Sequence, residues 1–198
     1  MNLHDLVALE AHGPDTYVGM GHPYPWGGLY GGHIVAQALA AAAATVDDSY
    51  MAHSLRAYFI ERGDNSQTVR YEVDRIRNGR SFATRRVVSR QTRGAILNLE
   101  CSFQVPETTT DLDAVSLPEG LVAPEQLPSD TWSDVFDRRW VRGDHVPMSR
   151  RGVTGWVGAW MRAKTDGSAS QFEHQCALAY ISDDLPTDAV FELSLIHI

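Results

Sequence analysis

Residues 30–46, YGGHIVAQALAAAAATV, restrict the possible folds more than any other stretch, because half of the residues that follow the pair of glycines are alanine. Alanine has the highest helix propensity, so the stretch is predicted to be helical. It contains no Asp, Glu, Lys or Arg, although a surface helix normally carries such residues on one face. A buried helix is therefore expected. Its small side chains let a curved sheet approach closely, and Gly31 and Gly32 allow close backbone contact at its start.

Strand-like segments flank this helix in the sequence. A short one precedes it at 16–20, and four follow it at 52–60, 68–77, 80–91 and 95–105. The last alternates apolar and polar residues, which is typical of a half-buried antiparallel strand. Asn78 and Gly79 between two of the segments form the strongest short hairpin signal. The first 105 residues are thus predicted to form a strand, a helix and a four-stranded meander that covers the helix.

The remaining residues resemble a second copy of this beginning. Residues 106–131 are rich in proline and acids and are predicted to be a linker. Two tryptophan-bearing strand segments follow at 132–143 and 152–164, and then a helix over 166–185. The second set lacks a meander. The expected organisation is α+β, with a first unit at 1–105, the linker at 106–131 and an incomplete second unit at 132–198.

Charge and composition exclude several classes of protein. The net charge of −8 argues against a nucleic-acid binder. No apolar run is long enough for a membrane span and the first residues lack the pattern of a signal peptide, so a cytoplasmic location is expected. Cys101 and Cys176 are far apart in sequence, have no CxxC spacing and are expected to be reduced and to lie in the core.

Arginine is concentrated in one part of the chain. Residues 56–93 hold ten arginines and four acids, which makes this segment about +6 in a chain of net charge −8. The planar guanidinium group suits bidentate contact with phosphate. Each arginine can equally be a solvent-facing strand residue, and the sequence leaves both interpretations open.

The sequence contains none of the familiar catalytic or cofactor-binding motifs. It has no GxSxG elbow and no P-loop, and VGMGHPY lacks the third glycine of a dinucleotide loop. The eight histidines are scattered without an HExxH motif, so neither a metal site nor a cofactor is predicted.

Asp183 is the candidate catalytic residue. It continues the apolar stripe of the predicted helix, so it is expected to face the sheet, although the helix dipole disfavours a carboxylate at that end. Such a costly group implies a partner or a function. Asp184 is expected to turn away and be exposed. A frayed helix end that exposes both acids is the alternative. The stripe consists of Phe172, Cys176, Ala179, Tyr180 and Asp183.

Five stretches resemble the type II acyl-CoA thioesterases, which carry two hotdog domains in one chain: GGHIVAQAL, HSLRAYFIERGD, YEVDRIRNGRSFATRRVVSRQ, ILNLECSFQ and ALAYISD. They cover most of 30–104 and 150–185 in matching order and spacing. The resemblance implies an antiparallel sheet wrapped around a central helix. In that family an aspartate, a hydroxyl residue and a glutamine hold the water that hydrolyses the thioester. The aspartate maps onto Asp183, and the other two lie beyond Ile198.

The resemblance implies an acyl-CoA thioesterase of fatty acid and lipid metabolism, with acyl-CoA as substrate and no cofactor. Hotdogs generally pair their sheets, so a homo-oligomer is expected. The family usually has glutamine where this chain has His33, and no role is carried over to that position. The first helix has no acid matching Asp183, so the first hotdog is expected to be structural or to shape the substrate site.

The tail FELSLIHI does not resemble the family, so a truncated or misread frame and an inactive fragment are expected possibilities. A non-catalytic acyl-CoA-binding or interaction module is the alternative function. A hotdog dehydratase or hydratase ranks last, because no helix carries a paired aspartate and histidine for that chemistry.

Overall fold

The computed structural model describes residues 2–22, 24–110, 112–141, 157–165 and 167–185. Contacts divide the chain into two units. One comprises Met1–Thr108 with Thr165–Tyr180, and the other comprises Thr109–Lys164 with Ile181–Ile198. The predicted boundaries after residues 105 and 131 stay a prediction, and much of the predicted strand at 152–164 lies outside the described residues.

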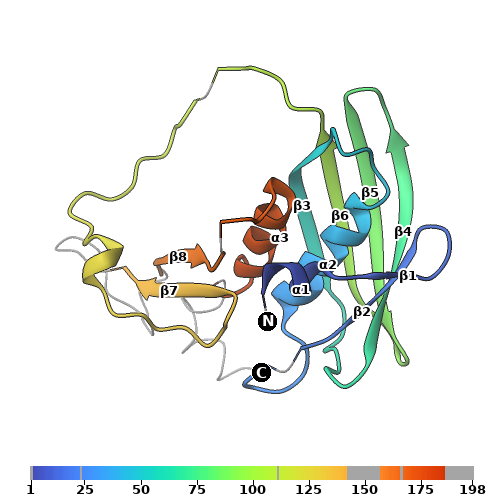
Figure 1. The fold of residues 1–198 in the computed structure, drawn as a ribbon, viewed down its shortest axis with the longest axis horizontal. Helices are drawn as coiled ribbons and strands as arrows, with labels where there is room; N and C mark the ends of the chain where they lie inside the picture. Colours follow the sequence, from blue (N-terminus) through green and yellow to red (C-terminus); the bar gives the residue numbers. More distant parts are fainter. Residues whose placement is uncertain (1, 23, 111, 142–156, 166, 186–198) are drawn as a thin grey trace. The chain divides into compact units, whose positions relative to one another are not determined.

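A six-stranded antiparallel sheet forms most of the first unit, in the order β1-β2-β4-β5-β6-β3 (Figure 1). Strands β4, β5 and β6 form a meander, but β3 pairs with β6 and not with β4. The predicted four-stranded meander was therefore wrong about residues 52–60. Strand β2 occupies the outer edge of β4, so the free edge of β6 accepts β3. The strands are β1 (Glu10–Ala11), β2 (Thr16–Met20), β3 (Met51–Phe59), β4 (Thr68–Asn78), β5 (Phe82–Gln91) and β6 (Gly94–Gln104).

The local patterns of the sheet agree with the sequence. Asn78 pairs with Ala83, and the Gly79 N–H donates a 2.9 Å hydrogen bond to the Phe82 carbonyl, which confirms the predicted hairpin. The alternation in β6 is also confirmed. The apolar residues of one face are buried, namely Leu97, Leu99, Cys101 and Phe103.

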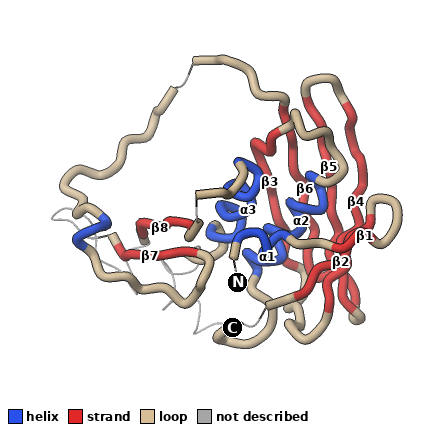
Figure 2. The backbone as a smooth tube through the Cα atoms, viewed as in Figure 1, coloured by secondary structure: helices blue, strands red, loops and turns tan. Residues whose placement is uncertain are grey.

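Helix α2 (Gly31–Ala43) lies against the sheet and contacts strands β2 to β6 (Figure 2). Every residue from Gly32 to Ala42 is buried, so the expectation of a buried alanine helix is confirmed. A short helix α1 (Leu3–Val7), which the sequence analysis missed, also contacts α2. Ile34, Val35 and Leu39 are the larger apolar anchors, each contributing about 1.5–3 kcal/mol through burial. This is the hotdog arrangement.

Two buried polar groups fasten α2 to the sheet. The Gln37 side chain accepts a 2.7 Å hydrogen bond from the Tyr71 hydroxyl and donates one of 3.3 Å to the Met20 carbonyl. Just beyond the C-terminal end of the helix, the Arg85 guanidinium on β5 donates to the side chain and the carbonyl of Thr45. Both contacts fix the position of the helix along the sheet.

The second unit contains a two-stranded antiparallel sheet of β7 (Phe136–Trp140) and β8 (Ala159–Ala163), and the single turn η1 (Pro124–Gln126). Helix α3 (Gln171–Ile181) crosses from the first unit into the second at its last residue. It is shorter than the predicted helix at 166–185. Ser170 and Glu173 form reciprocal capping hydrogen bonds, so the helix begins only after Ser170.

Candidate active site

Asp183 lies in the turn that follows α3. The helix ends at Ile181, and the Asp184 N–H closes the turn with a 3.0 Å hydrogen bond to the Ile181 carbonyl. Asp183 is half-buried and Ser182 is exposed. The turn, and not the helical stripe inferred from the sequence, therefore sets the direction of the Asp183 side chain. The apolar residues of the stripe behave as predicted, because Cys176, Ala179 and Tyr180 are buried.

Asp184 corrects the sequence analysis, which expected an exposed side chain. Its carboxylate is only 4% exposed. One oxygen lies 2.6 Å from Nη1 of Arg138, and the other accepts a 2.7 Å hydrogen bond from Nε1 of Trp132. A buried carboxylate normally requires such partners. The frayed end that would expose both acids is excluded by the same contacts.

Arg138 on β7 is itself held by several groups. Its Nε donates a 2.8 Å hydrogen bond to the Asp130 carbonyl, and its guanidinium lies 4.6 Å from the ring centroid of Trp140. Trp140 in turn donates a 2.6 Å hydrogen bond to the Asp130 carboxylate. The turn that carries Asp183 is thus anchored to β7 through its neighbour Asp184.

The start of α2 makes a close contact with the end of α3. A Cβ added to Gly32 would lie 2.1 Å from the carbonyl oxygen of Tyr180. The Tyr30 hydroxyl donates a 2.9 Å hydrogen bond to the same carbonyl. The expected close approach at Gly32 is confirmed, and the group that approaches it is a backbone carbonyl of α3.

Replacing Gly32 with alanine is therefore expected to destabilise the protein. Helix propensity alone would make alanine about 1 kcal/mol more stable at this position. The new methyl group would instead push the Tyr180 carbonyl away, and overpacking of this kind costs about 1–3 kcal/mol. Chemical denaturation should show a lower free energy of unfolding. A gain close to the propensity value would contradict the contact.

His33, in the first turn of α2, is 2% exposed, and its Nε2 atom has no hydrogen-bond partner among the residues that the structure describes. Burial, followed by the charge of His22, lowers its pKa to about 3, so the ring stays neutral near pH 7. The two histidine rings stack with centroids 4.9 Å apart. Unfolding restores an ordinary pKa of 6.5, so the unfolded state binds more protons and His33 makes the protein less stable as the pH falls below 6.5 towards 3.

Both thiols are buried, as predicted. Burial raises the pKa of Cys101 to about 12 and also raises the pKa of Cys176. A thiol that resists ionisation at neutral pH is a poor nucleophile. Neither thiol is therefore a good candidate for a nucleophile.

Most arginines of residues 56–93 have local structural partners. Those with a carboxylate partner are Arg70, Arg75, Arg86, Arg90 and Arg93. Arg62 donates to the carbonyls of Trp26 and Gly27. Within the described part of the chain, exposed Arg56, Arg77 and Arg80 have no carboxylate partner and remain available for an anion.

The first unit contains an apolar cleft of about 480 Å³ at the end of α2. Its walls come from α2, β3, β6 and α3 and include Ala40, Ala43, Met51, Phe103 and Phe172. This volume falls within the range of about 300–1,000 Å³ that is typical of small-molecule sites. The alanine side chains of α2 are too small to fill the space beside the sheet.

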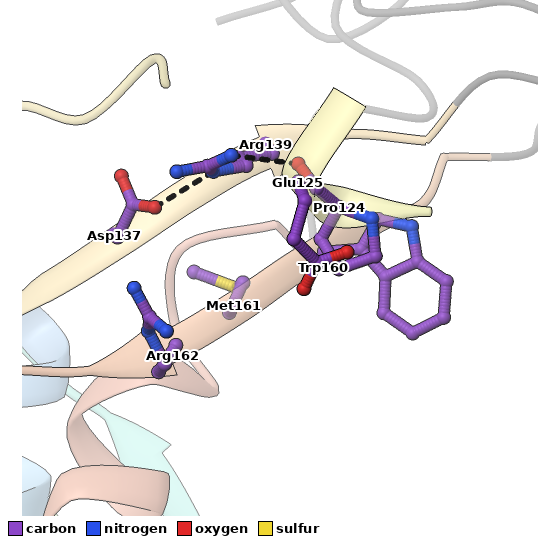
Figure 3. A pocket seen from close by; sticks show the side chains of 7 residues that line it. All are labelled: Pro124, Glu125, Asp137, Arg139, Trp160, Met161 and Arg162. Atoms are coloured by element: carbon purple, nitrogen blue, oxygen red, sulfur yellow. Dashed lines mark hydrogen bonds and ion pairs between the residues drawn. The ribbon is translucent and has the colours of Figure 1, made fainter. Parts of the chain in front are cut away.

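A smaller cleft of about 160 Å³ lies beside β7 and β8 in the second unit (Figure 3). Trp160 and Arg162 line it. The guanidinium of Arg139 is occupied, because it donates to Asp137 at 2.8 Å and to the Pro124 carbonyl at 2.7 Å. This cleft is therefore a weaker candidate for an anionic ligand.

The described residues contain no group of three or more histidine, cysteine or acidic side chains that could hold a metal ion. Among the same residues, no helix is long and apolar enough to cross a membrane.

Known proteins with similar sequences and structures carry the same fold. Residues 22–104 match the family described as the acyl-CoA thioesterase N-terminal domain. Acyl-coenzyme A thioesterase 8 of Homo sapiens is 30% identical over 90% of this chain and 63% of its own length. The chain thus spans less than two thirds of this curated relative. A protein with the hotdog fold from Alicyclobacillus acidocaldarius, 19% identical with a TM-score of 0.76, supports the fold alone.

Two mycobacterial structures are more similar in sequence. The acyl-CoA thioesterase II TesB2 of Mycobacterium marinum is 30% identical, with a TM-score of 0.73 over 91% of this chain and 66% of that one. The tesB protein of Mycobacterium avium subs paratuberculosis is also 30% identical, with a TM-score of 0.76 over 96% of this chain and 73% of that one. With one hotdog and part of a second, the chain belongs to the type II acyl-CoA thioesterase family.

Proposed function

We propose that this protein hydrolyses fatty acyl-CoA to a free fatty acid and coenzyme A, with Asp183 as general base. The observation that carries the proposal is a half-buried aspartate in the YISD turn at the end of α3, in a chain of this family. Asp184 does not compete for this role, because Arg138 and Trp132 occupy its two oxygens.

The proposed reaction needs one water molecule and no covalent intermediate. The Asp183 carboxylate accepts a proton as the water oxygen bonds to the acyl carbon. The carbon–sulfur bond then breaks, and coenzyme A leaves as a thiolate that takes up the proton from Asp183 and so restores the carboxylate. A positioned base of this kind contributes about 10²–10⁴-fold to the rate. The raised pKa of Cys101 and Cys176 favours water over a thiolate as the attacking group.

The acyl chain is proposed to occupy the cleft at the end of α2. Phe103 and Phe172 offer apolar walls, and the alanines of α2 leave room beside them. Each buried methylene would contribute about 0.8 kcal/mol to binding.

We further propose that the protein forms a homo-oligomer through β3 and serves fatty acid metabolism in the cytoplasm. Strand β3 lies at the edge of the sheet, and no described strand pairs with its outer side. Leu55, Tyr58, Phe59 and the adjoining Ile60 are exposed there. An unpaired edge with apolar side chains favours pairing with another chain.

Phe59→Lys is expected to shift the protein towards monomer in sedimentation velocity, because it places a charge on this edge. Ile76→Lys is the matched control, since Ile76 is also an exposed apolar residue, at 61% against 53% for Phe59, but lies on β4 and not on β3. Equal effects of the two variants, or a monomeric wild type, would contradict association through β3.

Two parallel measurements test the proposed reaction. Release of free thiol from a medium-chain acyl-CoA reports hydrolysis, and calorimetry with a non-hydrolysable thioether analogue reports binding. Binding together with thiol release supports the thioesterase. Binding without release would instead support a non-catalytic acyl-CoA-binding module.

A further inference from the structure

We propose that Asp184 and Arg138 are positioning residues that hold the Asp183 carboxylate in its working orientation. This inference rests on the proposed function of Asp183. The pair is an ion pair of 2.6 Å between side chains that are 4% and 8% exposed. A second contact, from the Trp132 indole to the other Asp184 oxygen, fixes the rotation of the carboxylate.

The anchor on the β7 side is rigid. Arg138 lies in the paired register of β7 with Met161 of β8. Its guanidinium is further fixed by the Asp130 carbonyl and the face of Trp140, and its Nη2 lies 3.8 Å from the Asp130 carboxylate. Asp184 is therefore held by a side chain that has little freedom of its own.

The pair can act on Asp183 because the two aspartates share a peptide bond. Movement of Asp184 must rotate the backbone that carries the Asp183 side chain. The Asp184 N–H also closes the turn on the Ile181 carbonyl. Loss of the side-chain anchor removes contacts that hold the Asp184 side of this turn in place. A misplacement of about 1 Å at a reacting group can reduce the rate about 10²-fold.

The test compares Asp184→Asn and Asp184→Leu in the full chain. Asparagine can keep the hydrogen bond from Trp132 but removes the ion pair, whereas leucine removes both contacts. We expect kcat for acyl-CoA hydrolysis to fall about 10-fold in Asp184→Asn and about 100-fold in Asp184→Leu, with KM unchanged. Arg138→Lys, which keeps the charge, is expected to retain more activity than Arg138→Met.

Asp137→Asn is the matched control. Asp137 is also on β7 and is also paired with an arginine at 2.8 Å, but its partner is Arg139 and its other hydrogen bond comes from Ser129 and not from the turn. Circular dichroism and thermal unfolding verify that each variant is folded. A fall in kcat no larger than that of the control, or a graded loss that appears in KM alone, would overturn the proposal.

Hydrogen exchange of the Ser182–Asp184 amides gives a readout that does not depend on activity. Exchange should accelerate in Asp184→Asn and not in Asp137→Asn. If the wild type releases no thiol, the proposed function fails. The hydrogen exchange rates then test by themselves whether Asp184 and Arg138 hold the turn in place. Unchanged exchange in that case overturns the positioning pair, and faster exchange confined to the turn supports it.

Discussion

Asp183→Asn is expected to lower kcat for acyl-CoA hydrolysis about 10²–10⁴-fold while leaving acyl-CoA binding nearly unchanged. The amide is close in size to the carboxylate and disturbs the turn little, but it cannot accept a proton from water. The loss should therefore appear in kcat and not in KM. Thiol release under saturating substrate measures kcat, and calorimetry with a thioether analogue measures binding.

Asp134→Asn provides the comparison for Asp183→Asn. Asp134 is an exposed aspartate before β7, so its change carries the same loss of charge without touching the turn after α3. Its kcat should equal that of the wild type. Equal activity in the Asp183 and Asp134 variants would remove Asp183 from the proposed mechanism.

Arg85→Met is expected to reduce the free energy of unfolding by about 3–5 kcal/mol. Arg85 is 2% exposed and donates only to uncharged oxygens. Methionine would leave the two buried oxygens of Thr45 without this donor, and each unsatisfied buried acceptor costs about 1–3 kcal/mol. The acceptors of the Arg85 guanidinium are the Thr45 hydroxyl and carbonyl, the Arg77 and Thr84 carbonyls and the Asn78 side chain.

The next residue on β5 supplies a close control. Arg86 is exposed and pairs with Asp74 at 2.6 Å, and a surface pair of this kind contributes only about 0–1 kcal/mol. Arg86→Met should therefore change stability little in the same denaturation experiment. Similar losses in both variants would contradict a structural role for the buried guanidinium.

The sequence patterns were sufficient to predict α2 and β6, whereas the short helix α1 that contacts α2 was missed. The uncharged alanine segment and the alternation of residues 95–105 each indicate which side chains are buried. A helix that packs against a sheet requires such buried faces. Strand order was harder. Alternation of apolar and polar residues indicates which face of a strand is apolar, but it does not indicate which strand lies beside it. The pairing of β3 with β6 could therefore not be inferred from that pattern.

The candidate site was only partly predictable for a different reason. The helical stripe was extended to Asp183, and Asp184 was expected to point away from it, but the helix ends at Ile181 and helical geometry no longer applies beyond it. Arg138, the partner that buries Asp184, is 46 residues away in sequence. Arg85 did leave a sign, because it alternates in phase with the buried Ala83 and Val87 of the same strand.

One single-turnover experiment tests direct attack by water most sharply. The full chain, in molar excess over a medium-chain acyl-CoA, is mixed with this substrate in ¹⁸O-labelled water. Mass spectrometry then measures the masses of the fatty acid and of the intact protein. The proposed reaction predicts one labelled oxygen in the fatty acid carboxylate and a protein of unchanged mass throughout. An acylated or labelled protein, or bound acyl-CoA that stays intact, would contradict it.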